Sequence, residues 1–200
     1  MNAAHASPVV MVMAAGAATR FGSAKQLARL PNGCTLVRHA ALTAVETGLP
    51  VQLVIGAHGE LVRAELVGLD IAIVDASEWW RGIGRSIAQG VDALLARGAA
   101  PSGLLLSLAD LPQVTADDLL RLADLHRQSP DRLLVSGFGD NRGPPCLFPA
   151  DCLPALQALD GDDGARTVVK AQAARMVTVP LAAAGFDIDQ PADLLKMPRA

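Results

Sequence analysis

The loop at residues 14–25 combines small side chains with two cations, directly after an apolar run at residues 8–14. Backbone N–H groups approach a bound anion closely only where the side chains are small. Arg20 adds a planar guanidinium that matches phosphate oxygens, and Lys25 adds a mobile positive charge. The loop therefore predicts a polyphosphate site, with backbone contacts from five small residues: Ala14, Ala15, Gly16, Ala17 and Ala18.

Two widespread phosphate-binding patterns do not account for this loop. The dinucleotide-binding pattern GxGxxG fails because Ala18 stands where its second glycine is needed. The P-loop pattern GxxxxGK[ST] fails because Phe21 stands at its second glycine and no Gly-Lys pair follows. An ordinary strand-to-helix turn with two solvated charges stays open as the alternative.

An acidic residue, Asp110, falls at the end of the apolar run at residues 103–110. A carboxylate at the end of a buried strand is costly unless a cation or hydrogen-bond donors compensate it. Oxygen ligands without a cluster of His or Cys favour magnesium. Asp110 is therefore a candidate metal ligand, although aspartate is also common where a strand enters a turn.

The elements that must position these residues alternate along the chain. Runs that are apolar at every position predict strands buried on both faces: 8–14, 51–57, 71–76, 103–110, 132–138 and 176–181. Apolar residues at three- and four-residue spacing predict helices at 34–48, 83–98 and 115–128, and a final helix is expected from near Gln190. Alternating strands and helices predict an open, mostly parallel α/β sheet, with ligands at the carboxyl ends of the strands.

Composition narrows the function classes. The chain has 200 residues, 51% of them hydrophobic, and a formal net charge of −3, so we expect one well-buried domain over residues 1–200. The basic residues are scattered, which argues against nucleic acid or an anionic membrane as a partner. Three cysteines without zinc-site spacing, together with the absence of a signal-peptide pattern or an apolar run long enough for a membrane span, predict a cytoplasmic protein.

The segment "MAAGAATRFGSAK" resembles the opening of the molybdenum-cofactor nucleotidyltransferases, the MobA-like family, whose pattern is L-A-[AG]-G-x-x-x-R-[MF]-G-x-x-K. Four later segments are similar to family motifs in the same order, so the resemblance covers residues 9 to about 195: "WWRGIGRSIAQGV", "SLADLPQV", "RGPPCLFPADCLPALQALDGDDGAR" and "AGFDIDQPADL". This resemblance implies a single-domain, Rossmann-like, three-layer open sheet of the nucleotide-diphospho-sugar transferase type, mostly parallel with one antiparallel strand.

The resemblance also implies roles for individual residues. Asp110 and Asp189 become the ligands of Mg²⁺, with Asp187 less favoured and Asp193 expected as a carboxylate in the first turn of a helix. Arg20, Lys25 and Asp110 become the catalytic residues. The nucleotide-binding set adds Gly22, Gly82 and Ser86 to the loop, and the acceptor-binding set is Asp162 and Arg166. Purely structural roles stay open as alternatives: an ordinary helix start at Gly82 and Ser86, and a surface loop in which Arg166 forms an ion pair.

The function that the resemblance implies is transfer of a nucleoside monophosphate from an NTP to a phosphorylated acceptor, with release of pyrophosphate. The "AAG" at 14–16 and the "GDDGAR" element at 161–166 resemble the cytidylyl branch, which uses CTP and molybdopterin and serves molybdoenzymes of the xanthine-dehydrogenase family. Alternatives are a guanylyl- or cytidylyltransferase acting on another phosphorylated acceptor, a cofactor-binding and delivery factor without catalysis, and a MobA-like reductase. Trp79 and Trp80 depart from the family pattern, and stacking on a pterin, an oligomer surface and packing stay open for them.

Overall fold

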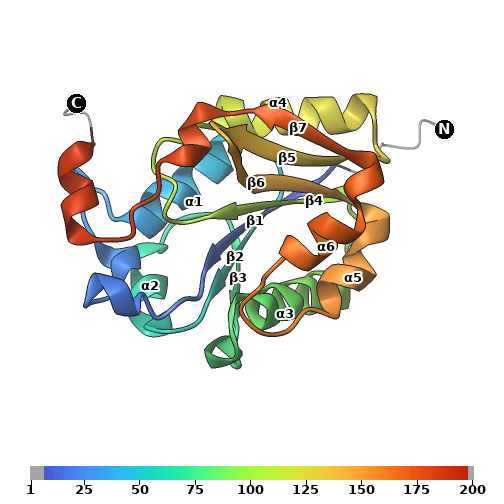
Figure 1. Cartoon of the computed structure of the whole chain (residues 1–200). Helices are drawn as coiled ribbons and strands as arrows, with labels where there is room; N and C mark the ends of the chain where they lie inside the picture. Colours follow the sequence, from blue (N-terminus) through green and yellow to red (C-terminus); the bar gives the residue numbers. More distant parts are fainter. Residues whose placement is uncertain (1–6, 198–200) are drawn as a thin grey trace.

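The computed structural model describes residues 7–197, with the exception of the Arg20 side chain. Its centre is one seven-stranded sheet of order β3-β2-β1-β4-β6-β5-β7 (Figure 1). All neighbouring pairs are parallel except those of β6, which runs antiparallel to both β4 and β5. The strands are β1 Val9–Ala14, β2 Val51–Ile55, β3 Ala72–Asp75, β4 Gly103–Leu108, β5 Leu133–Phe138, β6 Asn141–Pro149 and β7 Met176–Pro180. The prediction of a mostly parallel sheet with one antiparallel strand is confirmed.

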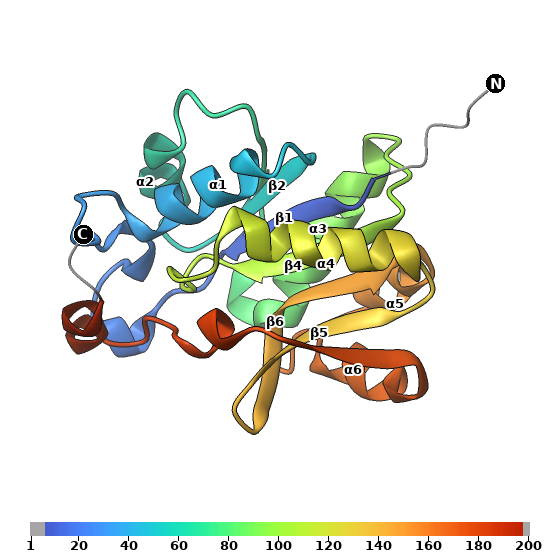
Figure 2. The same cartoon turned by 90° about the horizontal axis from the view of Figure 1, so that it is seen from above.

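Helices cover both faces of this sheet and complete three layers (Figure 2). One core contains buried residues of α3, α5 and α6, and the opposite core contains those of α1, α2 and α4. The α-helices are α1 Leu36–Glu46, α2 Gly59–Glu65, α3 Ile83–Ala96, α4 Ala116–Gln128, α5 Leu153–Gln157 and α6 Arg166–Ala171. The structure also contains short 3-10 helices: η1 Thr19–Phe21, η2 Lys25–Leu27, η3 Trp79–Arg81, η4 Ala150–Cys152, η5 Ala173–Arg175, η6 Ala182–Gly185 and η7 Pro191–Lys196.

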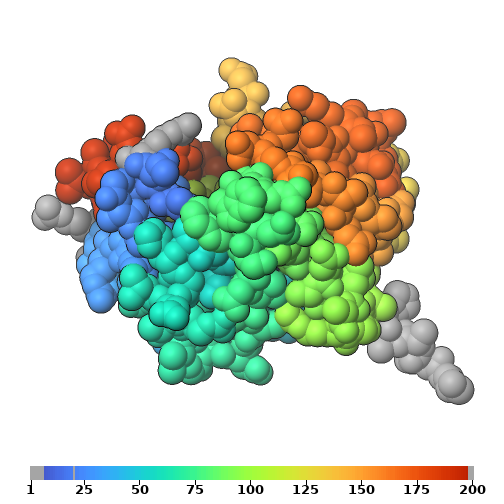
Figure 3. Space-filling view, turned by 90° about the horizontal axis from the view of Figure 1, so that it is seen from below, coloured from blue at the N-terminus to red at the C-terminus, as the bar shows by residue number. Residues whose placement is uncertain are grey.

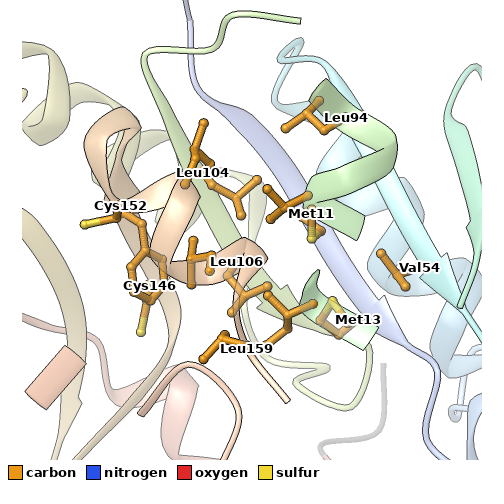
Figure 4. Close-up of a cluster of buried hydrophobic side chains, with 14 of the residues drawn as sticks. Met11, Met13, Val54, Leu94, Leu104, Leu106, Cys146, Cys152 and Leu159 are labelled. Atoms are coloured by element: carbon orange, nitrogen blue, oxygen red, sulfur yellow. The ribbon is translucent and has the colours of Figure 1, made fainter. Parts of the chain in front are cut away.

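The unbroken apolar runs follow from this layering. In β1, Met11 and Met13 belong to one core while Val10 and Val12 belong to the other, because successive side chains of a strand point to opposite faces. Figure 4 shows Met11 and Met13 among the buried side chains of the first core, with Leu104 and Leu106 between them and Cys146. Burial raises the pKa of the Cys146 thiol to about 12, so this cysteine packs as a neutral, small side chain.

Local signals set the ends of two helices as predicted. Thr115 caps α4 by accepting a hydrogen bond from the backbone N–H of Asp118, and the Asp118 carboxylate accepts in return from the N–H of Thr115. Gly98 follows α3 with a φ of +75°, the left-handed conformation that favours glycine after a helix. Of these two helices, α3 begins at the cavity described below.

Several parts of the chain differ from the sequence-based expectations. The short helices α2, α5 and α6 were not predicted. The proline-containing segment from Asn141 to Pro149 forms β6, which the apolar pattern did not predict because its outer residues are polar and exposed. The helix expected near Gln190 is only the 3-10 helix η7, with hydrogen bonds from the N–H of Asp193 to Gln190 O and from that of Met197 to Leu194 O. Asp193 does lie in its first turn, as expected.

Candidate functional site

A cavity of about 380 Å³ opens where β1 and β4 end and α3 begins. Figure 3 looks at this face, with segments near residue 20 in blue, near residue 80 in green and near residue 160 in orange. The lining residues are Met13, Ala14, Ala15, Gly16, Ala17, Ala18, Lys25, Gln26, Leu36, Trp79, Trp80, Gly82, Ile83, Ser86, Leu108, Ala109, Asp110 and Asp162. The predicted location at the carboxyl ends of parallel strands therefore matches the cavity.

The small-residue loop leaves β1 and bends sharply at the cavity. Ala18 has a φ of +54° and Gly22 a φ of +76°, so the chain turns twice through the left-handed region, which costs Ala18 more than Gly22 because of its Cβ. The carbonyl oxygen of Ala15 accepts a hydrogen bond of 3.0 Å from the N–H of Ala57. The start of the loop is thereby tied to the end of β2.

Gln26, which the sequence analysis did not single out, holds the inner side of this loop. It is 6% exposed, and its Nε2 donates to the carbonyl oxygens of Ala14 at 3.1 Å and of Gly16 at 2.5 Å. Because carbonyl oxygens only accept, the orientation of the amide is fixed, and its Oε1 is buried without a hydrogen bond. The available signal was a polar residue directly after Lys25, within a segment of small and apolar residues.

Lys25 joins the two acidic segments that the resemblance paired. Its Nζ lies 2.7 Å from Asp110 Oδ2 and 3.1 Å from Asp189 Oδ1, and its side chain is only 17% exposed. Burial alone would lower the pKa of Lys25, but the charges and hydrogen bonds of Asp110 and Asp189 outweigh it and raise that pKa above its usual value. The lysine is therefore a permanent cation between two carboxylates at neutral pH.

The segment that carries Asp189 is fixed to the end of β4. The N–H of Ile188 donates to Asp110 O at 3.0 Å, and the Asp193 carboxylate accepts from the N–H of Asp189 at 3.1 Å. Burial first, and then the nearby charges of Asp189 and Asp110, raise the pKa of Asp187. Three carboxylates thus come from two segments that are distant in the sequence.

The donor set fits a hard divalent cation. Among residues 7–197, no three His, Cys, Asp or Glu side chains gather as a ready-made metal site. Asp110 Oδ1, however, is buried and makes no hydrogen bond, and Asp189 lies on the other side of the same ammonium group. Two carboxylates that leave further positions to phosphate oxygens and water are typical of Mg²⁺ sites.

The far wall of the cavity depends on a close backbone approach at Gly82. Its φ is +108°, and a Cβ there would lie 2.4 Å from the backbone of Gly161, so no other residue fits without displacement. The N–H of Gly84 donates to Gly161 O at 2.8 Å. This contact brings Asp162 to the cavity beside Ser86, which is buried in the first turn of α3.

Most of the predicted site residues are thus gathered in one place, with four qualifications. Asp189 pairs with Lys25 but is not among the residues that line the cavity. Gly22 is exposed in the turn after η1 and is not among the residues that line the cavity. Arg166 is exposed at the start of α6 and does not line it either. The backbone of Arg20 lies in η1, but its side chain is outside the described part of the structure.

The profile of the MobA-like NTP transferase domain matches residues 10–176. The chain belongs to this family. Two proteins with given names are similar in sequence. "Purine catabolism protein PucB" of Bacillus subtilis is 37% identical over 90 residues, which is 45% of this chain and 42% of that protein. "Probable molybdenum cofactor guanylyltransferase" of Rhodopirellula baltica is 26% identical over 159 residues, 76% of this chain and 74% of that protein.

Solved structures agree with the membership in the MobA-like family. Rv0371c from Mycobacterium tuberculosis superposes with a TM-score of 0.76 at 27% identity, over 95% of this chain and 97% of the other. A complex of Rv0371c with manganese has a TM-score of 0.72 at 26% identity, over 95% and 97% of the two chains. The fold is that of the nucleotide-diphospho-sugar transferases, whose members typically depend on a divalent metal. Within residues 7–197, no helix is long and apolar enough to cross a bilayer.

Proposed function

We propose that this MobA-like protein is a Mg²⁺-dependent nucleotidyltransferase that moves CMP from CTP to the terminal phosphate of molybdopterin and releases pyrophosphate. One observation carries the proposal. Lys25 lies 2.7 Å from Asp110 and 3.1 Å from Asp189. Lys25 and Asp110 line the same cavity as the small-residue loop, so a cationic side chain, a carboxylate and a loop suited to anions meet there, with the second carboxylate, Asp189, on the same lysine. We treat residues 1–200 as one catalytic domain.

In the proposed complex the triphosphate lies along the loop. Backbone N–H groups of Ala15 to Ala18 and the guanidinium of Arg20 receive the β- and γ-phosphates, and Lys25 receives phosphate oxygens on the attacking side. Ser86 and the Gly82 backbone contact ribose or base. Such contacts hold the reacting groups in line and neutralise their charge, which is the main source of rate in phosphoryl-type transfer.

The transfer needs no covalent intermediate on the protein. An oxygen of the acceptor phosphate attacks the α-phosphorus; the new P–O bond forms as the bond to the β-phosphate oxygen breaks, and pyrophosphate leaves. Bound Mg²⁺ would supply charge neutralisation at the triphosphate, held by Asp110 and Asp189. Lys25 would then exchange contacts with these carboxylates for contacts with phosphate, a move that its unbranched side chain allows.

The acceptor side is built on the contact between Gly82 and Gly161. Asp162 lines the cavity there and would accept hydrogen bonds from donor groups of the acceptor. Arg166 lies outside the cavity, so it would reach only the phosphate of an acceptor that extends past Asp162. The expected recipient of the product is a cytoplasmic molybdoenzyme of the xanthine-dehydrogenase family.

A specific observation favours GTP as the second candidate nucleotide. The relative from Rhodopirellula baltica, which aligns over 76% of this chain, is named as a guanylyltransferase. The "AAG" of the loop at 14–16 favours CTP by resemblance to the cytidylyl branch. Both candidates use the same phosphate and metal contacts, and they differ only where Ser86 and Gly82 meet the base.

The test is pyrophosphate release with Mg²⁺ and CTP, GTP, ATP or UTP, with and without molybdopterin carrying molybdate. Release that needs both CTP and the pterin supports the proposal, and release with GTP alone selects the second candidate. A folded protein that releases pyrophosphate with none of the four nucleotides contradicts nucleotidyl transfer to this acceptor. Another acceptor or a delivery factor would then become the leading hypothesis.

A further inference from the structure

The two adjacent tryptophans of η3 lie in different environments. Trp79 is partly buried and packs against the core that includes α3, where a Cβ on Gly56 would lie 2.7 Å from its own Cβ. Trp80 is 69% exposed and lines the cavity. Of the roles that the sequence left open, packing therefore describes Trp79 but not Trp80.

The turn that carries Trp80 is held on both sides. The Glu78 carboxylate accepts hydrogen bonds from Arg81 Nη1 at 2.8 Å and Arg85 Nε at 2.6 Å, and Arg81 also pairs with Asp160. Exposed ion pairs stabilise little one at a time. Here three of them converge on a single turn, which Gly82 closes by donating its N–H to Trp79 O at 3.1 Å. The backbone beneath Trp80 is thus held in place before any ligand arrives.

An apolar rim at this mouth calls for an apolar ligand group. Ile83 is 39% exposed and lines the cavity together with Trp80, so two large hydrophobic side chains are exposed at the same site. Isolated exposed hydrophobics need no explanation. A tryptophan on a turn that ion pairs hold in place offers a flat π surface. Ring systems stack favourably on such a surface, whereas a phosphate group makes no stacking interaction with it.

We propose that Trp80 is a stacking platform for a planar heterocyclic ring of the substrate, either the nucleobase or the ring system of the acceptor. This inference rests on the proposed function, because it assumes that the cavity receives a nucleotide and its acceptor. It assigns a substrate-contacting role to a residue that departs from the family pattern.

The experiment is calorimetric titration of wild type, Trp80→Leu and Trp80→Phe with four probes: CTP, GTP, a free pterin and inorganic tripolyphosphate. Trp80→Leu should weaken binding of the ring-containing probe roughly tenfold and leave tripolyphosphate unaffected, and Trp80→Phe should restore most of the affinity. The probe that responds identifies the ring. Leu61→Ala is the matched control, because Leu61 is also an exposed apolar residue but does not line the cavity.

Two outcomes overturn the inference. Equal affinities of wild type and Trp80→Leu for all three ring probes would show that no ring stacks on Trp80. Equal weakening of tripolyphosphate and the ring probes would show that the change merely disturbs the site. The chain has two tryptophans and no tyrosine, so loss of nucleotide quenching of tryptophan emission in Trp80→Leu gives a second, independent readout.

Failure of this inference is distinguishable from failure of the proposed function. Pyrophosphate release by wild type together with unchanged ring affinity in Trp80→Leu would remove only the stacking role. Absence of pyrophosphate release from wild type, with ring binding that still depends on Trp80, would remove only the transferase reaction.

Discussion

The backbone N–H of Ile188 donates to the carbonyl oxygen of Asp110 across 3.0 Å. This single hydrogen bond sets the late segment that carries Asp189 against the end of β4, and it explains how two carboxylates far apart in sequence reach the same lysine. The pairing is thus fixed by main chain and does not depend on the side chains alone. Substitution of either carboxylate should therefore change the chemistry while the fold persists.

Asp110→Asn should lower turnover about a hundredfold, the typical loss when one electrostatic contact to the transition state is removed. Asparagine keeps the shape of the side chain but loses the charge that would hold Mg²⁺. Steady-state pyrophosphate release as a function of Mg²⁺ concentration measures the effect, with Asp117→Asn in the exposed first turn of α4 as the control. Normal activity of Asp110→Asn would contradict the metal assignment.

Lys25→Gln should tighten Mn²⁺ binding in the absence of nucleotide while it reduces turnover. If Asp110 and Asp189 hold the metal as proposed, the ammonium of Lys25, which pairs with both, would compete with it, and removal of a competing contact worth about 1.4 kcal/mol changes an affinity tenfold. Electron paramagnetic resonance of free Mn²⁺ gives the affinity directly. Lys170→Gln, an exposed lysine of α6, should leave it unchanged, and an unchanged or weaker affinity in Lys25→Gln would refute competition.

Gln26→Glu should release the loop at residues 14–18 from the side chain at position 26 and weaken nucleotide binding. A carboxylate oxygen would replace the Nε2 that now donates to Ala14 O and Gly16 O, and burial of unpaired acceptors costs about 1–3 kcal/mol. We expect the calorimetric Kd for the nucleotide to rise roughly tenfold or more, with a smaller change in kcat. Gln172→Glu, away from the cavity, is the control, and an unchanged Kd would show that Gln26 does not position the loop.

Gly82→Ala should destabilise the fold more than Gly98→Ala. Both glycines have positive φ, but a Cβ at Gly82 meets Gly161 whereas a Cβ at Gly98 meets open space, so the comparison isolates the clash. We expect a difference of about 2 kcal/mol in the free energy of unfolding measured with urea. Equal losses in the two variants would mean that the loop at Gly161 yields without cost.

Protonation of His126 should lower the free energy of unfolding of the protein in mildly acidic solution. Burial lowers the pKa of His126, and its hydrogen bond to Ser102 O offsets only part of that effect. With Nε2 donating, the buried Nδ1 has no partner, so protonation adds a proton that nothing accepts. The folded pKa is depressed; stability is therefore fully present above the unfolded pKa of about 6.5 and is lost as the pH falls towards the folded value.

The measurement for His126 is the melting temperature between neutral pH and pH about 5, in wild type and in His126→Gln. Glutamine can keep the donor to Ser102 O but does not titrate, so the acid decline should be smaller in the variant. His39→Gln serves as the matched change of a partly buried histidine. A decline of the same size in wild type and His126→Gln would assign it to other groups.

The sequence alone allowed prediction of those site residues that residue type and local position identify. Asp110 was recognisable because it ends a buried strand, and Lys25 because it follows a run of small residues. The contact between them was not, since it depends on how η2 folds back towards β4. Asp189 came from resemblance to the family, because nothing in its local segment shows that Ile188 pairs with Asp110.

The misses also have physical causes. Gln26 carries no periodic signal, and only the closed loop turns its amide towards two carbonyls. β6 was hidden because its first residues are polar and exposed, while its later residues are buried between β4 and β5. The different environments of Trp79 and Trp80 follow from tertiary contacts of η3, which adjacent identical residues cannot reveal.

The antiparallel β6 has a consequence for the order in which the site is completed. It lies between β4 and β5, with β7 beyond β5 at the edge of the sheet, so the chain passes through the edge strand β7 before the segment with Asp189 returns to Asp110. During synthesis, the loop at residues 14–25 emerges first and Asp189 last. A chain made only as far as α4 would therefore contain this loop and Asp110 but lack Asp189, so under the proposed function the metal site would be incomplete until the last segment has been made.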